Sequence, residues 1–173
     1  MNKYFLLLVS LCLLSCTHPE SNRNRNFGKR DSSSIFSESE NLSTVIDIKD
    51  GDTYVILIED KEVIVRLDHI DCPEKRQPFG MQAKKFASDL CFDKTVFLVS
   101  KNKFDRYNRL IAEVFLENGV CVNKELVANG LAWHYKKYSR SRAYSELEKE
   151  ARAKKIGLWR ELYPIPPWNW RKK

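Results

Sequence analysis

The sequence predicts one α+β domain preceded by a segment that does not fold with it. Five stretches rich in β-branched residues lie between residues 44 and 116, and helical periodicity recurs in three other stretches. Gly, Pro and Asn mark the boundaries between these stretches. The 173 residues are enough for one ordinary domain but not comfortably for two.

The strands are predicted over residues 44–48, 53–59, 61–68, 94–100 and 109–116. The first ends at the turn signal Lys-Asp-Gly-Asp, and the second and third form a hairpin that turns at Asp60. His69 is expected to lie within a strand and to be structural. An Asn-Gly pair after the fifth strand is a strong turn signal.

The helices are predicted from apolar residues at three- and four-residue spacing. One helix covers residues 81–91, and a short one covers residues 122–129 and ends at Gly130. A last helix over residues 140–155 is expected to start at Ser139 as its N-cap. Its predicted apolar stripe consists of Ala143, Leu147 and Ala151.

The N-terminus is typical of a secretory signal. Lys3 precedes an apolar run over residues 4–14, and Ser15 and Cys16 follow. The run is too short for a comfortable membrane span, which needs about 20 apolar residues. Residues 1–16 are therefore predicted to be a signal peptide, which would direct the protein out of the cytoplasm.

The Leu-Leu-Ser-Cys junction at the end of this signal also resembles a bacterial lipobox. In a lipobox the cysteine is acylated and becomes the new N-terminus, so Cys16 is the predicted lipidation site. Dual or triple acylation would anchor the protein stably at a membrane of the cell envelope. The alternative is ordinary cleavage and release of a secreted protein.

Composition divides the rest of the chain into three parts. Residues 17–41 are rich in Ser, Asn, Arg and Glu and contain too few apolar residues to fold, so they are predicted to be a disordered tether. Residues 42–162 form the predicted domain. Residues 163–173 form a Pro-, Trp- and Lys/Arg-rich tail that is expected to wrap around this domain, with an interaction tail as the alternative.

The charge of the chain favours a polyanionic partner. The formal net charge is +7, and +6 of it belongs to residues 42–173, since Lys3 is the one charge in the signal and the tether charges cancel. A basic domain suits nucleic acid through the electrostatic attraction common to all such binding. The same balance also occurs in soluble basic proteins of other functions, so the charge is only supporting evidence.

The cysteines do not indicate a zinc site. Cys72, Cys91 and Cys121 lie in the predicted domain, and no two of them have metal-ligand spacing. Cys91 and Cys121 lie in apolar surroundings and are expected to be small core residues. A disulfide between these two remains an open alternative.

Three short motifs carry the functional prediction. The first is Asp-Gly-Asp-Thr at residues 50–53, the second runs from Arg66 to Glu74, and the third is Asp-Arg-Tyr-Asn-Arg at residues 105–109. Together they supply two carboxylates for a hard cation, a further carboxylate and two arginines. These are the groups that phosphodiester cleavage requires.

These motifs resemble those of the staphylococcal nuclease (thermonuclease) family, over roughly residues 42–159. The resemblance implies an OB-fold-like five-stranded β-barrel packed by about three α-helices. Two departures occur. Cys72 replaces a threonine of the type protein, and residues 75–79 replace a longer flexible loop, which affects substrate preference more than chemistry.

The resemblance also implies a calcium site. Asp52 and Asp71 would be ligands, together with the backbone carbonyl of Cys72, and Asp50 would support the site from its periphery. Two carboxylates held together repel each other, and a hard cation with oxygen ligands relieves this repulsion.

Three further residues are predicted to be catalytic. The family resemblance implies that Glu74 orients or deprotonates the attacking water. Arg66 and Arg109 are the predicted phosphate clamps, because a guanidinium offers a planar fork of donors to phosphate oxygens. The alternative for both arginines is a structural role in salt bridges to neighbouring acids.

Aromatic residues interleaved with cations suit single-stranded nucleic acid. The predicted substrate-binding residues are Tyr107, Tyr135, Lys136 and Tyr138. Trp133 could equally belong to the core, and His134 is expected to be structural.

The prediction is therefore an exported, monomeric, calcium-dependent nuclease that hydrolyses DNA and RNA. The resemblance implies that the 5′-oxygen leaves, so that the products carry 3′-phosphates. Nothing in the motifs reads the 2′-hydroxyl. The alternative is a non-catalytic nucleic-acid-binding module of the same fold at the cell envelope.

Overall fold

The structure is a computed structural model that describes residues 43–172. The predicted signal peptide, its lipidation site Cys16 and the predicted tether therefore lie outside the described residues. The described part begins one residue after the predicted start of the domain. None of its helices is long and apolar enough to cross a membrane.

Five strands close into a barrel, which confirms the predicted fold class. Their order around the barrel is β1-β2-β3-β6-β5, and β5 pairs back onto β1. The β3–β6 pair is parallel and the other pairs are antiparallel. The bounds are β1 (Ser43–Asp50), β2 (Thr53–Ile58), β3 (Lys61–Leu67), β5 (Thr95–Phe104) and β6 (Leu110–Leu116).

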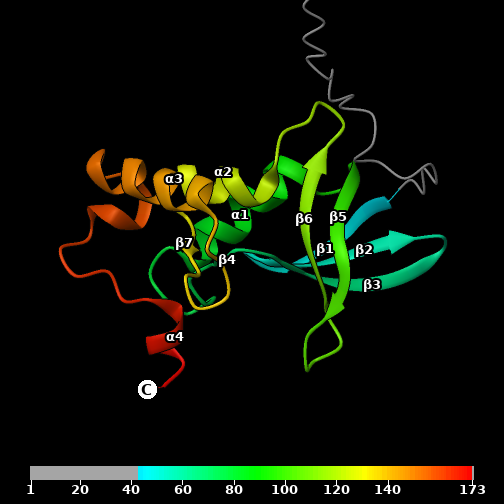
Figure 1. The fold of residues 1–173 in the computed structure, drawn as a ribbon, viewed down its shortest axis with the longest axis horizontal. Coiled ribbons are helices and arrows are strands. Elements are labelled where there is room, and N and C mark those ends of the chain that lie inside the picture. The colour runs from blue at the N-terminus through cyan, green and yellow to red at the C-terminus, as the bar shows by residue number, and fades with distance from the viewer. Residues whose placement is uncertain (1–42, 173) are drawn as a thin grey trace, which may run out of the picture. The chain divides into compact units, whose positions relative to one another are not determined.

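The three longer helices lie together on one side of the barrel (Figure 1). They are α1 (Gly80–Cys91), α2 (Val122–Ala128) and α3 (Arg142–Ala153), followed by the 3-10 helix η2 (Gly157–Arg160) and the one-turn helix α4 (Pro167–Trp170). A two-stranded sheet of β4 (Ile70–Asp71) and β7 (Trp133–His134) lies beside the barrel, below the longer helices in Figure 1.

One hydrophobic core joins the barrel to α1 and α2. It includes Tyr54, Ile56 and Val65 of the barrel and Ala83 and Leu126 of the helices, all fully buried. These residues follow the twofold and helical spacings of the sequence. A second, smaller cluster joins Trp133, Leu158 and Trp159 to Ala151 of α3.

The start and register of α3 differ from the prediction. The N-cap is Ser141, because Ser139 is buried and its hydroxyl lies 2.8 Å from both His69 Nδ1 and His134 Nε2. Ala143 is exposed, since its neighbour Tyr144 turns inward and donates a hydrogen bond to Glu113 at 2.5 Å. The buried face of α3 therefore consists of Tyr144, Glu148 and Ala151.

His69 lies in a tight turn, and the prediction that it lies within a strand is wrong. Its φ of 68° is incompatible with a strand, and the turn separates β3 from β4. Cys72, Cys91 and Cys121 are all buried free thiols, so the Cys91–Cys121 disulfide that the sequence left open is absent from the described residues.

Candidate active site

A groove of about 940 Å³ opens at one end of the barrel and brings the three motifs together. Its walls come from the β1–β2 turn, the chain from β3 to β4, the β5–β6 loop, the segment after β7 and the C-terminal tail. The predicted acids and arginines that line it are Asp50, Asp52, Arg66, Asp71, Glu74 and Arg109. Segments as far apart in sequence as Asp50 and Lys172 therefore share one surface.

Asp52 and Asp71 both contact the same nitrogen of the Arg66 guanidinium. Arg66 Nη2 is 3.2 Å from Asp52 Oδ2 and 2.7 Å from Asp71 Oδ1. Asp52 ends the turn between β1 and β2, where its N–H donates to Asp50 Oδ1 at 3.1 Å. Asp71 belongs to β4, which pairs with β7. Both carboxylates are buried, and both approach the same guanidinium nitrogen.

The electrostatics of Asp52 favour a cation. Its pKa is raised to about 7, mainly by burial, and the charges of Asp50 and Asp71 contribute to this rise while Arg66 and the Cys72 N–H oppose it. A positive ion would reverse this effect by stabilising the ionised form. The two carboxylates therefore fit a hard cation that prefers oxygen ligands.

The protein offers such an ion an incomplete set of ligands. Within residues 43–172, no three His, Cys, Asp or Glu side chains are grouped so that they could hold a metal ion. Backbone oxygen, water and substrate oxygen would have to complete the coordination shell, as is common for calcium and magnesium. Affinity for the ion is therefore expected to depend on bound substrate.

The Cys72 side chain is not suited to bind the cation. It is buried against Gly51, where an added Cβ would lie 2.8 Å from the Cys72 Cβ. Burial raises the pKa of its thiol well above the usual value, so the thiol stays neutral. The Cys72 N–H donates to Asp52 Oδ2 at 2.5 Å. Coordination through its carbonyl stays a prediction.

Arg66 is fixed from several sides. Nη1 donates to the carbonyls of Leu67 at 2.7 Å and Ile70 at 2.9 Å, while Nη2 reaches the two aspartates. Its side chain is 13% exposed. Burial would lower its pKa, but Asp52 and Asp71 raise it above the usual value. The guanidinium is therefore charged and preorganised at the base of the groove.

Arg109 is held by the loop that carries it. Asp105 Oδ2 accepts hydrogen bonds from its Nε at 2.8 Å and lies 2.7 Å from its Nη2. Burial opposes ionisation of Asp105, but the bonds from Arg109 lower its pKa. Arg109 Nη1 also lies 3.4 Å from Thr53 Oγ1, beside Asp52. The third motif thus folds into a support that aims Arg109 into the groove.

Glu74 stands at the mouth of the groove, where its side chain is 37% exposed. Pro73 precedes Glu74, and the Glu74 N–H donates a hydrogen bond to Gln77 Oε1 at 3.2 Å. The first residue of α1, Gly80, packs directly on this segment, since an added Cβ would lie 1.9 Å from the Glu74 carbonyl oxygen. The start of α1 therefore sets the position of Glu74.

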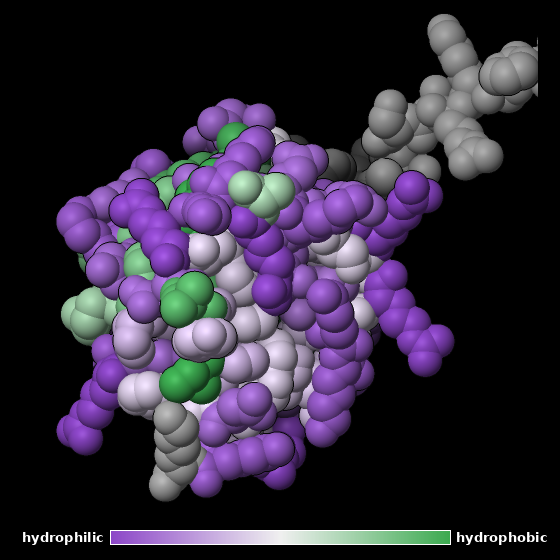
Figure 2. Space-filling view, turned by 90° about the vertical axis from the view of Figure 1, so that its left-hand side faces the viewer, coloured by the Kyte–Doolittle hydropathy of each residue, from purple (hydrophilic) through white to green (hydrophobic). Residues whose placement is uncertain are grey.

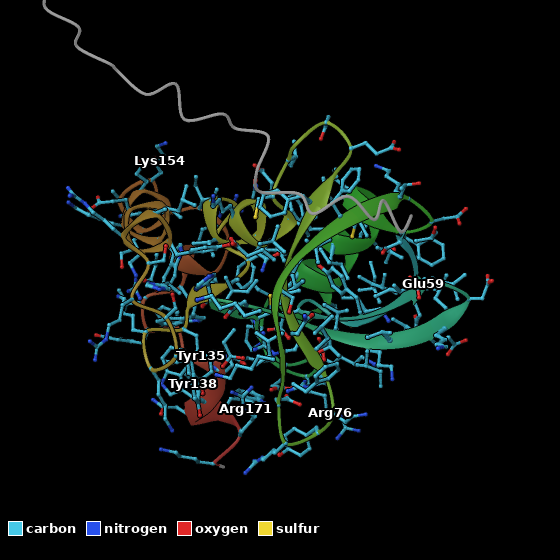
Figure 3. All side chains as sticks on the ribbon, turned by 45° about the vertical axis from the view of Figure 1, so that its right-hand side comes forward. Glu59, Arg76, Tyr135, Tyr138, Lys154 and Arg171 are labelled. Carbon is cyan, nitrogen blue, oxygen red and sulfur yellow. The ribbon has the colours of Figure 1, made fainter. Side chains whose placement is uncertain are left out.

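The predicted substrate-binding residues divide into two groups. Tyr107, Tyr135 and Tyr138 line the groove, and Tyr107 and Tyr138 are more than 60% exposed. Figure 3 shows Tyr135 and Tyr138 beside each other, with ring centroids 4.8 Å apart. Lys136 does not line the groove. Its Nζ pairs with Glu148 at 2.8 Å, and Lys137 lines the groove instead.

The C-terminal tail also contributes to this site, which was not predicted from the sequence. Arg171 and Lys172 line the groove, and Arg171 forms ion pairs with Asp71 and Glu74. The motifs gave no signal for this, because the tail lies about a hundred residues from either acid. The one feature of the sequence that could have indicated this contribution is the run of Arg and Lys after two tryptophans.

The fold and the groove define a class of protein, a barrel-fold nuclease with acids and arginines fixed in one groove. A family model described as "Staphylococcal nuclease homologue" matches residues 64–161. The chain belongs to this family, and it is a hydrolase of nucleic acids. Members of the family generally depend on a metal ion.

Relatives with similar sequences carry nuclease names. An "Uncharacterized endonuclease" of Haemophilus influenzae is 43% identical over 141 residues, which cover 81% of this chain and 78% of the relative. A "Micrococcal nuclease" of Shigella flexneri is 36% identical over 142 residues, covering 74% and 79%. A "Staphylococcal-like nuclease CAN1" of Arabidopsis thaliana is 35% identical over 116 residues, covering 65% of this chain and 34% of the relative.

Proposed function

We propose that this nuclease uses calcium and cleaves both DNA and RNA, releasing products with 3′-phosphates. The observation that carries the proposal is the pair Asp52 and Asp71, two buried carboxylates within 3.2 Å of one guanidinium nitrogen. Their oxygens suit a hard cation, and the arginines beside them suit phosphate. A bound calcium ion would offset charge on the scissile phosphate and fix its position.

The residues of the chain have separate tasks in this proposal. Arg66 and Arg109 bind the non-bridging phosphate oxygens and stabilise the charge that develops there. Their bonds to Asp71 and Asp105 hold the two guanidinium groups in place before substrate arrives. Glu74 accepts a hydrogen bond from the attacking water and directs it to phosphorus, and its exposed position leaves room for that water.

The substrate strand is proposed to follow the exposed side of the groove. Tyr107, Tyr135 and Tyr138 offer faces and edges on which bases can stack, and Lys137 lies among them. Arg106 Cζ lies 4.7 Å from the ring centroid of Tyr107, which places a cation beside a stacking surface. None of these groups is arranged to detect a 2′-hydroxyl, which supports action on both nucleic acids.

The protein is also proposed to be exported, anchored through Cys16, and monomeric. The lipobox-like junction at residues 13–16 supports the first two statements. The face seen in Figure 2 is mostly hydrophilic, with separate hydrophobic side chains instead of one continuous apolar area. This supports the monomer, because stable dimers usually bury a large apolar surface.

The test is cleavage of plasmid DNA and of RNA by the purified protein, with calcium or with a calcium chelator. We expect both substrates to be cut with calcium and neither with the chelator. Products should accept a 5′-label directly and become substrates for 3′-extension only after phosphatase treatment. Cleavage that persists in the chelator would overturn the calcium requirement, and products with free 3′-hydroxyls would overturn the proposed bond scission.

A further inference from the structure

The C-terminal tail has a fixed base next to the groove. Trp168 stacks on Tyr135, with ring centroids 5.2 Å apart and planes 2° from parallel, and it meets Trp133 edge-on at 5.6 Å. The Gln77 side chain donates a hydrogen bond to the carbonyl of Ile165. Pro167 begins α4, and its carbonyl accepts the Arg171 N–H at 3.0 Å. Arg171 therefore extends from an anchored backbone.

The guanidinium of Arg171 forms ion pairs with two acids of the site, Asp71 and Glu74. Its Nη2 lies 2.7 Å from Asp71 Oδ2, and its Nη1 lies 2.6 Å from Glu74 Oε1. Since Arg66 bonds to Asp71 Oδ1, both oxygens of Asp71 carry a guanidinium partner. A cation that coordinates Asp71 therefore competes with a positively charged group at either oxygen.

The two arginines differ in their freedom to leave. Arg66 is 13% exposed and is tied to two backbone carbonyls as well as to the acids. Arg171 is 43% exposed, and within residues 43–172 its guanidinium donates hydrogen bonds to Asp71 and Glu74 alone. A cation at the acids would repel Arg171 and remove its partner. Arg171 is therefore the group that moves.

A displaced Arg171 stays inside the groove. Its backbone is held by α4, and the groove around it is lined by Tyr135, Lys137, Tyr138 and Lys172. Figure 3 shows Arg171 next to Tyr135 and Tyr138. Those tyrosines are the proposed stacking surface for the substrate strand, so the phosphates of that strand would lie in the same groove as the freed guanidinium. Guanidinium and phosphate form paired, charge-assisted hydrogen bonds.

We infer that Arg171 is a third arginine of the active site and binds a substrate phosphate. In the resting protein it neutralises Asp71 and Glu74, and when a divalent cation binds Asp71 it transfers to the strand and leaves Glu74 free for the attacking water. The inference rests on the proposed function, because it needs a cation at Asp71 and a nucleic acid in the groove. It adds a substrate-binding residue from the tail that the three motifs do not contain.

The test uses binding measurements on Arg171→Gln and on the parent protein. The first measurement is calcium affinity of the protein without nucleic acid, by calorimetry. We expect the variant to bind calcium about three- to tenfold more tightly, since one competing positive charge is gone. The second is affinity at saturating calcium for a phosphorothioate-linked thymidine tetramer, which resists cleavage. We expect it to fall about tenfold, the scale of one charge-assisted contact.

Salt dependence separates a phosphate contact from a structural role. For single strands, the slope of log affinity against log salt changes by about 0.7 for each phosphate contact. Arg171→Gln should lose about that amount. The control is Arg76→Gln, which removes an equal charge from an exposed residue two positions after Glu74 but outside the groove. It should leave the slope and the calcium affinity unchanged.

Three results would overturn the inference. An unchanged salt slope in Arg171→Gln would exclude a phosphate contact, and unchanged calcium affinity would exclude the exchange between acids and strand. If Arg171→Gln bound calcium more tightly but bound the tetramer as the parent does, Arg171 would only compete with calcium and would not bind substrate. In each case the parent protein would still bind calcium and cleave nucleic acid. A parent that does neither would instead refute the proposed function.

Discussion

At the scale of single residues, the site depends on guanidinium groups held by several acceptors at once. Asp105 binds Arg109 through Nε and Nη2, at 2.8 and 2.7 Å, and Arg66 is held by two carbonyls and two carboxylates. A lysine provides one charged nitrogen and cannot reproduce this geometry. Charge alone should therefore be insufficient at either position.

Replacing Arg109 by Lys tests this point. We expect turnover to fall about a hundredfold, the effect of losing one preorganised donor to the transition state, while affinity for an uncleaved oligonucleotide changes little. Single-turnover rates at saturating calcium would measure the first quantity and fluorescence anisotropy the second. Arg160→Lys, at an exposed position of η2, serves as control. Near-parental turnover in Arg109→Lys would refute the clamp assignment.

At the scale of elements, α1 acts as a support for the loop that carries Glu74. Its first residue, Gly80, leaves no space for a side chain, because a Cβ there would lie 1.9 Å from the Glu74 carbonyl oxygen. The preceding residue, Phe79, has a φ of 67°, so the chain turns sharply into the helix. Helix start and catalytic loop are therefore packed as one unit.

Gly80→Ala should disturb both stability and activity. The clash involves backbone on both sides, so we expect a loss of about 1–3 kcal/mol in the free energy of unfolding, together with a large loss of turnover. Gly119→Ala is the control, because Gly119 has a φ of 81° but open space around it. The control should cost about 1 kcal/mol through backbone strain and keep its turnover. Urea unfolding and cleavage assays give both values, and unchanged turnover in Gly80→Ala would contradict the support role.

The β7 strand makes a pH-dependent contribution to stability. His134 is 1% exposed, with Nε2 2.8 Å from Ser139 Oγ and Nδ1 3.1 Å from Ser145 Oγ. Burial lowers its pKa and Lys136 adds to this, while Glu148 opposes it. The unfolded chain therefore binds a proton at higher pH than the folded chain does. Stability from this group is present above about pH 6.5 and is lost as pH falls below that value.

His134→Gln should remove this dependence. We expect the parent to lose stability below about pH 6.5 with a slope of at most about 1.4 kcal/mol per pH unit from this residue, and the variant to show a correspondingly shallower slope. Ser145→Ala keeps the imidazole and should keep the slope. Urea unfolding at several pH values would measure it. Equal slopes in His134→Gln and the parent would show that another group is responsible.

At the scale of the whole molecule, the barrel brings together the β1–β2 turn, the β3–β4 chain and the β5–β6 loop. The tail adds Arg171 to the same groove from the C-terminal end of the sequence. The N-terminal residues before this domain are proposed to fix its place in the cell through Cys16. The proposed attachment is through acyl chains on Cys16.

Cys16→Ser should move the protein from the membrane fraction to the soluble fraction. Acyl chains supply the membrane affinity, and a serine cannot carry the thioether-linked lipid. Fractionation with a labelled fatty acid would show both the position and the modification. Activity of the folded domain should be retained, since residues 43–172 contain the groove. A variant that stays with membranes and keeps its label would disprove the lipobox interpretation.

The sequence by itself determined the five barrel strands and the three longer helices to within a few residues, because their apolar spacing reflects local geometry that each segment carries alone. The short elements β4, β7, η2 and α4 were not predicted. It also determined the acids and arginines, since Asp52, Asp71, Glu74, Arg66 and Arg109 stand in short motifs whose chemistry can be read locally. Its predicted roles for these residues await the experiments above.

Only the tertiary structure decided which groups face one another. Ser139 bridges two imidazoles instead of capping α3, and Lys136 pairs with Glu148 while Lys137 lines the groove. Arg171 reaches Asp71 and Glu74 because Trp168 anchors the tail on Tyr135. Such contacts depend on the packing of elements distant in sequence, and no local pattern encodes the direction in which a side chain on one element meets another.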